Sequence, residues 1–129
     1  MHHGALALAR AAFKAYLDKD RRALESLLDD DFHFTSPLDN ALDRATYLRL
    51  CWPNSQAMQA VDEIHGIESG DRAVVVYEVR TPAGKRFRNT ELHTARDGKL
   101  VSVEVYFGWD LPHRAAPGGH VDNDGHGAG

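Results

Sequence analysis

Three polar residues, Asn89, Glu91 and His93, are spaced two apart along one stretch of the sequence. In an extended strand such residues point to the same face, with successive ones roughly 7 Å apart along the backbone. A carboxylate and an imidazole at that spacing can contact each other or hold one ligand between them. If this face is buried, the pair is a candidate for acid–base chemistry, because glutamate is seldom buried unless it is paired or used.

The candidate catalytic residues are therefore Glu91 and His93. Burial disfavours the charged form of a carboxyl group and makes it usable as an acid or base near neutrality, where histidine also exchanges protons. Such a pair suits proton transfer next to a carbonyl, aldol cyclisation or dehydration. Tyr16, Tyr77 and Asn89 are candidate donors to a developing oxyanion. The alternative interpretation is a hydrogen-bonded pair that only anchors the strand to the rest of the fold.

Alternating apolar residues and intervening turn residues predict the strands that position this pair. The expected strands cover residues 57–68, 73–81, 86–95 and 100–109, and a shorter one covers residues 32–36, where Pro37 ends it. The charge-rich faces of these strands belong outside. That places Tyr77, Val103, Val105 and Phe107 on the inner face with Glu91.

Apolar residues at three- and four-residue spacing predict a first helix over residues 5–18. Asp20 is suited to cap a second, short helix, which the acidic run 29–31 ends as a solvated turn. Asp43 opens a third helix, which Pro53 closes. Helices followed by an antiparallel meander predict an α+β domain, with a curved, mostly antiparallel sheet wrapped around the N-terminal helices and an apolar pocket between them.

Several residues are expected to line that pocket and bind a ligand. They are Tyr16, Phe34, Ser36, Trp52, Tyr77, Asn89, Phe107 and Trp109. Ser36 has no triad evident in the sequence, so nucleophilic catalysis is not expected from it. Asp39 follows in the next loop, where a turn-forming role is the first expectation and a base at the pocket mouth is the alternative.

The composition limits the possible functions. The chain has 129 residues, a formal net charge of −4 and no basic stripe, which argues for one domain and against nucleic-acid binding. The single Cys51 excludes an internal disulfide framework and a multi-cysteine zinc site, and we expect no metal and no cofactor. No segment is long and apolar enough to span a membrane, and a cytoplasmic location is the default expectation.

Two further expectations concern the surface and the C-terminus. The outer sheet face mixes apolar residues such as Val74, Val76 and Tyr106 with charged ones, which favours a homodimer formed through this face over scattered surface apolar residues. The domain is expected to cover residues 1–111. Residues 112–129, rich in glycine, proline and histidine, are expected to form a flexible tail.

The element order, the FTSP segment at 34–37 and the segment ELHTARDGKLVSVEVYFGW at 91–109 resemble the SnoaL-like group of the nuclear transport factor 2-like superfamily. The resemblance covers about residues 5–111 and implies a cystatin-like, cone-shaped α+β barrel with an internal pocket. The superfamily includes ketosteroid isomerases, epoxide hydrolases, polyketide cyclases, dehydratases and non-catalytic members, so the likeness does not fix the reaction. At the three positions that ketosteroid isomerases use for base and oxyanion donors, this chain has Ser36, Ala12 and Glu91. Only the last keeps an acidic group, which argues against that mechanism.

The sequence thus supports three hypotheses. The first is a cofactor-independent isomerase, cyclase or dehydratase that uses Glu91 and His93 on a small hydrophobic carbonyl or hydroxyl compound. The second is a non-catalytic protein that binds such a compound, and the third is a dimeric interaction module with an incidental cavity.

Overall fold

A computed structural model describes residues 4–122 of the chain, and within them the predicted α+β class is confirmed. The elements are α1 (Ala5–Leu17), α2 (Arg21–Leu27), β1 (Leu28–Ser36), β2 (Asp39–Asp43), α3 (Arg44–Leu50), a 3-10 helix η1 (Trp52–Ala57), β3 (Ala60–Ser69), β4 (Arg72–Arg80), β5 (Arg86–Arg96) and β6 (Lys99–Leu111).

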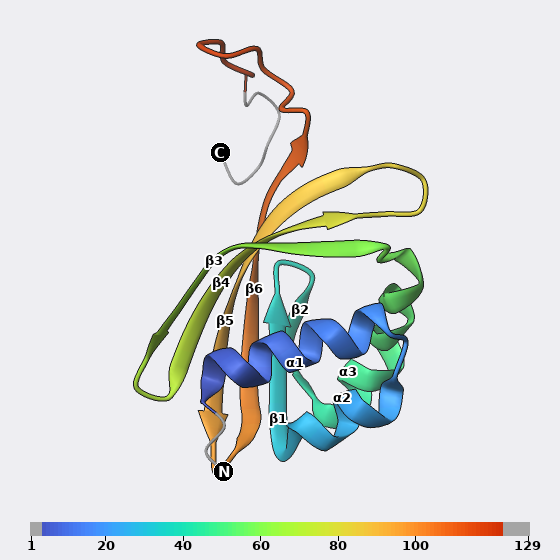
Figure 1. Cartoon of the computed structure of the whole chain (residues 1–129), viewed down its shortest axis with the longest axis vertical. Coiled ribbons are helices and arrows are strands. Elements are labelled where there is room, and N and C mark those ends of the chain that lie inside the picture. The colour runs from blue at the N-terminus through green and yellow to red at the C-terminus, as the bar shows by residue number, and fades with distance from the viewer. Residues whose placement is uncertain (1–3, 123–129) are drawn as a thin grey trace.

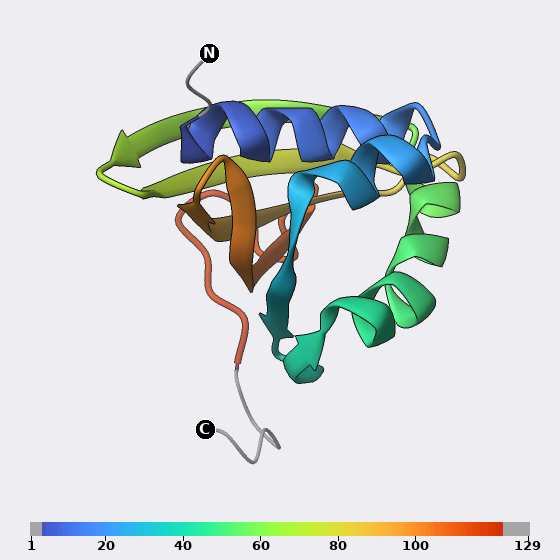
Figure 2. The same cartoon turned by 90° about the horizontal axis from the view of Figure 1, so that it is seen from below.

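One six-stranded sheet forms the wall of the fold, in the order β2-β1-β6-β5-β4-β3. The β1–β6 pair is parallel and every other neighbouring pair is antiparallel. The sheet stays open, with β2 and β3 at its edges. It curves around α1, which crosses its concave side, while α2, α3 and η1 close one flank (Figures 1 and 2). A concave sheet covered by helices on one side leaves room for a cavity between the layers.

Local sequence explains where the helices begin and how closely they pack. The carboxylates of Asp20 and Asp43 accept backbone N–H bonds from Ala23 and Thr46, and thereby cap α2 and α3 as predicted. The buried side of α1 is mostly small: Ala5, Leu8, Ala9, Ala12 and Ala15. Small residues let the helix lie close to its neighbours, while its larger Phe13 and Tyr16 reach into the space beyond.

Three local predictions were wrong. Residues 29–31 are part of strand β1, not a turn, and β1 therefore begins at Leu28. Residues 39–43 form β2, the edge strand that follows β1, where the sequence indicated only a turn. Pro53 does not end the helical region but stands near the start of η1, where proline's fixed φ and missing N–H are tolerated.

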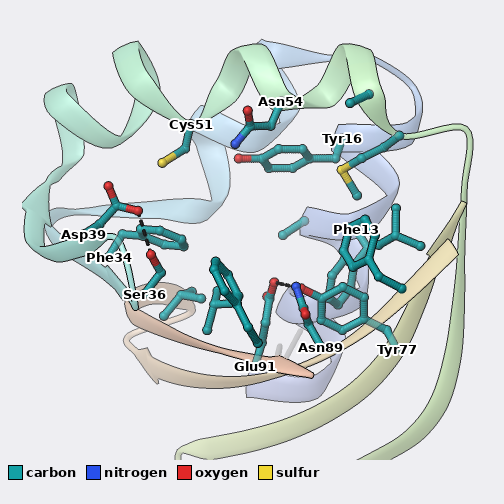
Figure 3. A pocket seen from close by; sticks show the side chains of 18 of the residues that line it. Phe13, Tyr16, Phe34, Ser36, Asp39, Cys51, Asn54, Tyr77, Asn89 and Glu91 are labelled. Carbon is teal, nitrogen blue, oxygen red and sulfur yellow. Dashed lines mark hydrogen bonds between the residues drawn. The ribbon is translucent and has the colours of Figure 1, made fainter. Parts of the chain in front are cut away.

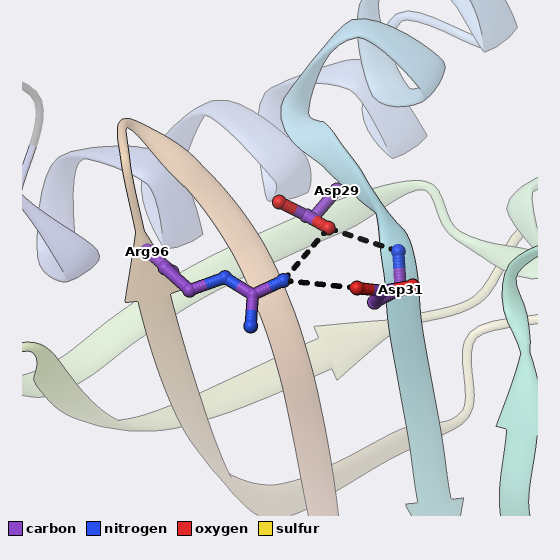
Figure 4. Close-up of polar contacts among 3 residues, drawn as sticks. All are labelled: Asp29, Asp31 and Arg96. Atoms are coloured by element: carbon purple, nitrogen blue, oxygen red, sulfur yellow. Dashed lines mark hydrogen bonds and ion pairs between the residues drawn. The ribbon is translucent and has the colours of Figure 1, made fainter.

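The acidic run in β1 is held by Arg96 at the end of β5. The guanidinium Nη2 of Arg96 lies 3.1 Å from Asp29 Oδ1 and 3.2 Å from Asp31 Oδ2 (Figure 4). The amide N–H of Asp31 also donates to Asp29 Oδ1, at 2.9 Å. These bonds give Asp29 and Asp31 partners within the sheet and so favour continuation of the strand through them.

The C-terminal segment has no regular structure where it is described. Residues 112–122 contain no helix or strand and lead away from the end of β6 (Figure 1). The flexible tail remains a prediction, and its residues 123–129 lie outside the described part of the chain. None of the helices in the described part of the chain has the length and apolar character needed to cross a membrane.

Candidate functional site

A cavity of about 550 Å³ lies between the concave sheet face and the helices, a size typical of small-molecule sites (Figure 3). Most of its wall is apolar. It includes Ala12, Phe13, Leu24, Leu28, Phe32, Phe34, Met58, Val79, Phe87, Leu100, Val103, Val105 and Phe107. The polar groups are few and are grouped at separate points of the wall, so each group can be described by itself.

Glu91 is at the centre of the deepest polar group. Its Oε2 accepts a 2.6 Å hydrogen bond from the Tyr77 hydroxyl, and its Oε1 lies 2.9 Å from His93 Nε2. The side chain of Glu91 is 14% exposed and that of His93 is 2% exposed. Glu91 and His93 share the inner face of β5 as predicted, and Tyr77 reaches Glu91 from β4, where it pairs with Asn89.

The contacts of His93 indicate which ring nitrogen carries hydrogen. Its Nδ1 is buried and has no hydrogen-bond partner among residues 4–122. An N–H group buried without an acceptor is costly, so hydrogen belongs on Nε2, where Glu91 accepts it. Both oxygens of Glu91 are therefore acceptors, and Glu91 is a carboxylate held by two neutral donors. His93 orients and stabilises this carboxylate.

Tyr77 and Asn89 support Glu91 from the neighbouring positions. Burial raises the pKa of Tyr77, and the charge of Glu91 raises it further, so the phenol stays protonated as a donor. A hydrogen bond from the Asn89 side chain to Tyr77 opposes this pKa rise. Asn89 Oδ1 in turn accepts the Gly108 N–H at 3.1 Å, beside the irregular register of β5 and β6. A side chain on Gly108 would collide with the Arg88 carbonyl oxygen, so this close approach requires glycine.

A second polar group, the hydroxyl pair of Tyr16 and Tyr47, enters the cavity from the helices. Their oxygens are 2.7 Å apart. Burial raises the pKa of both phenols, and the charge of Glu91 adds to both increases. Since one hydroxyl must donate to the other, the hydrogen of the acceptor hydroxyl is left for a ligand. Figure 3 shows Tyr16 and Glu91 on opposite sides of the cavity.

Ser36 and Asp39 form the third polar group, at the β1–β2 turn. Ser36 Oγ donates to Asp39 Oδ2 at 2.7 Å, and both residues line the cavity (Figure 3). The first expectation for Asp39, a turn former outside any strand, is thus incomplete, because Asp39 is in β2 and faces the cavity. Cys51 lines the same region, and burial raises the pKa of its thiol to about 11, with a further increase from the charge of Asp39.

The mouth of the cavity is open, and exposed apolar side chains lie there beside the exposed Asp110, which also lines the cavity. Phe107 and Trp109 line it as predicted, yet they are 53% and 54% exposed, and Leu38 is 82% exposed. Phe34 also lines the cavity and packs against Tyr47, with ring centroids 4.9 Å apart. The prediction that Trp52 lines the pocket is wrong. Its ring packs edge-on against Tyr16, 5.1 Å between centroids, and supports that tyrosine from behind.

Sequence reasoning missed several lining residues, above all Tyr47, Asn54 and Phe13. No role at the pocket was predicted for Tyr47, although it lies in the helix that was expected to begin at Asp43. The sequence feature that could have indicated its position is its spacing of four residues from Cys51, which places both side chains on one face of a helix. Asn54 is in η1, a helix that was not predicted, and no pattern in the sequence places it at the cavity.

Comparison with known proteins identifies the family. The sequence pattern of the SnoaL-like domain matches residues 9–103. The chain belongs to the SnoaL-like family. Among curated protein sequences, none matches it.

Solved structures show the same fold for the SnoaL-like chain. A protein from Kribbella flavida superimposes with a TM-score of 0.75 at 16% identity, over 81% of this chain and 87% of its own. A protein provisionally named a ketosteroid isomerase, also from Kribbella flavida, gives 0.69 at 20% identity, over 81% and 77%. A provisionally named polyketide cyclase from Sinorhizobium meliloti gives 0.66 at 21% identity, over 76% and 92%. These identities establish the fold, and the site must supply the argument for function.

Proposed function

We propose that this SnoaL-like protein is a cofactor-independent enzyme that moves a proton on a small hydrophobic compound bearing a carbonyl or hydroxyl group. The observation that carries the proposal is the Glu91 carboxylate, fixed by Tyr77 and His93 on the wall of a largely apolar cavity of about 550 Å³. A fixed carboxylate beside bound apolar substrate is the arrangement that general-base catalysis requires.

Different groups of the cavity bind the substrate, remove the proton and stabilise the developing charge. The apolar lining holds the substrate body and excludes water. Glu91 takes the proton from the carbon next to the carbonyl, and the electron pair moves onto the carbonyl oxygen as an enolate. The Tyr16–Tyr47 pair on the opposite wall donates a hydrogen bond to that oxygen, where negative charge develops. The related structures named as an isomerase and a polyketide cyclase are consistent with reactions through such enolates.

A non-catalytic ligand-binding role is the second candidate. One observation favours it: both oxygens of Glu91 already accept hydrogen bonds from the protein, so the carboxylate is satisfied without a ligand. In this role the same cavity binds the hydrophobic compound, and Glu91 only anchors β5 to β4.

Turnover of a generic probe separates the two candidates. In 5-nitrobenzisoxazole a base removes the ring C–H proton while the N–O bond breaks, which gives a coloured cyanophenolate without any co-reactant. We expect the wild type to accelerate this elimination and Glu91→Gln to lose most of that rate, since a positioned base contributes about 10²–10⁴-fold.

A thermal-shift screen against steroids, terpenoids and aromatic polyketides provides the binding readout. A ligand selective for the folded state raises Tm, and Glu91→Gln should keep that rise. Ligand binding together with a wild-type elimination rate no greater than that of acetate would support the binding role instead.

A further inference from the structure

We propose that Asp39 is a second catalytic carboxylate of this cavity, which accepts a proton from a different atom of the ligand than Glu91 does. The proposal rests on the function proposed above and adds to it. It implies a substrate with two separated positions that exchange protons, such as a β-dicarbonyl or β-hydroxy carbonyl compound.

The hairpin between β1 and β2 directs Asp39 inward. Ser36 and Asp39 are the paired residues on either side of the two-residue turn, Pro37 and Leu38. Directly paired residues of antiparallel strands place their side chains on the same face of the sheet. The β1 residues Phe32, Phe34 and Ser36 alternate onto the cavity face, so Asp39 must face the cavity with them.

Hydrogen bonds fix the carboxylate of Asp39 but leave one oxygen available. The Leu38 N–H donates to Ser36 Oγ at 3.0 Å, and the Ser36 hydroxyl donates to Asp39 Oδ2 at 2.7 Å. The serine hydrogen is committed, so Asp39 Oδ2 is an acceptor. Within residues 4–122, no donor to Asp39 Oδ1 is found and no basic side chain forms an ion pair with Asp39. Glu91 differs, because both of its oxygens are engaged.

The charge of Asp39 acts inside the cavity. Burial raises the pKa of Cys51, a helix-side residue of the same region that is 8% exposed, and the charge of Asp39 raises it further. Figure 3 shows Asp39 and Glu91 entering the cavity from different sides, one from the β1–β2 turn and one from β5. A half-buried carboxylate with a fixed position, a free oxygen and no cationic partner is suited to accept a proton. Asp39 and Glu91, fixed at separate points of the cavity wall, can address two atoms of one ligand.

The elimination of 5-nitrobenzisoxazole tests this directly, with four proteins compared: wild type, Glu91→Gln, Asp39→Asn, and the double variant. The small probe can lie against either carboxylate, so the two routes run in parallel. We expect Glu91→Gln to keep a rate clearly above that of acetate at equal concentration, and the additional Asp39→Asn change to remove it. Asparagine retains the acceptor for Ser36, so the fold is preserved, which circular dichroism and Tm check.

A matched control and three outcomes make the result decisive. Asp30→Asn in the Glu91→Gln background removes an exposed carboxylate of β1 outside the cavity and should leave the residual rate unchanged. An active wild type whose Glu91→Gln variant falls to the acetate rate would overturn the role of Asp39 and leave the proposed function standing. Equal rates for Glu91→Gln and the double variant would overturn it as well. A wild type no faster than acetate would contradict the proposed function, and the second carboxylate with it.

Discussion

The arrangement around Glu91 shows how single residues divide between structure and chemistry. Tyr77 and His93 each donate to one oxygen of the carboxylate, and the His93 ring is almost fully buried. Removing one partner of a buried hydrogen-bonded charge costs more than the net value of the bond, because the other partner remains unsatisfied. His93 is therefore expected to contribute strongly to stability through this hydrogen bond.

Replacing His93 by leucine tests this view. Leucine fills the apolar surroundings but cannot donate to Glu91, so we expect the free energy of unfolding in urea to fall by about 1–3 kcal/mol. The loss should be much smaller in a Glu91→Gln background, where no carboxylate needs the donor. His93→Gln, which keeps an N–H group, is the matched control. Equal losses in both backgrounds would mean that the contact contributes packing alone.

At the scale of elements, the alternating pattern of β5 was enough to predict that Asn89, Glu91 and His93 share the inner face. That prediction succeeded because the face of a strand residue follows from local periodicity. The β2 strand was not predicted, and for Asp39 the cavity position was only the alternative to a turn-forming role, because a short edge strand owes its structure to its partner β1. The parallel β1–β6 pair likewise depends on contacts between distant segments. Tyr47 was missed for a similar reason, since α3 could be predicted but not which wall it would complete.

The cap of α3 matters to the site because this helix carries Tyr47. The Asp43 carboxylate accepts the Thr46 backbone N–H, and this bond holds the pKa of Asp43 below its ordinary value. A lowered folded-state pKa stabilises the fold at pH values above the unfolded-state pKa of about 3.9, and the effect is lost as pH falls through the folded-state value.

Asp43→Asn keeps a capping side chain but cannot titrate. We expect the wild type to be the more stable protein near neutrality and its advantage to shrink below about pH 4. Urea unfolding of both proteins from pH 7 to pH 3 measures this difference. An advantage that stays constant over that range would show that the cap does not depend on ionisation of Asp43.

The whole molecule has an outer sheet face that the described chain leaves uncovered. Ile67, Val74 and Leu92 form one row across β3, β4 and β5, and Val76 and Tyr106 continue the apolar surface in the next row. Ile67, Val74 and Tyr106 are 64%, 38% and 54% exposed. The ion pairs of Glu78 with Arg86 and Arg88 lie beside this surface, as charged groups do at the rim of an interface.

We propose that a second copy of the chain covers this face, as the sequence also indicated. Light scattering after size exclusion should give a mass near twice 14.3 kDa. Val74→Glu should give the monomer mass, because a charge at the centre of an apolar interface has no partner there. Leu50→Glu adds the same charge at an exposed apolar position on α3 and should leave the dimer intact.

A monomeric wild type would contradict the dimer and remove the interaction-module hypothesis. A dimeric Val74→Glu variant would place the interface elsewhere. Because the cavity opens on the other side of the sheet, monomeric Val74→Glu should still bind ligand, and it thereby separates assembly from the chemistry of the site.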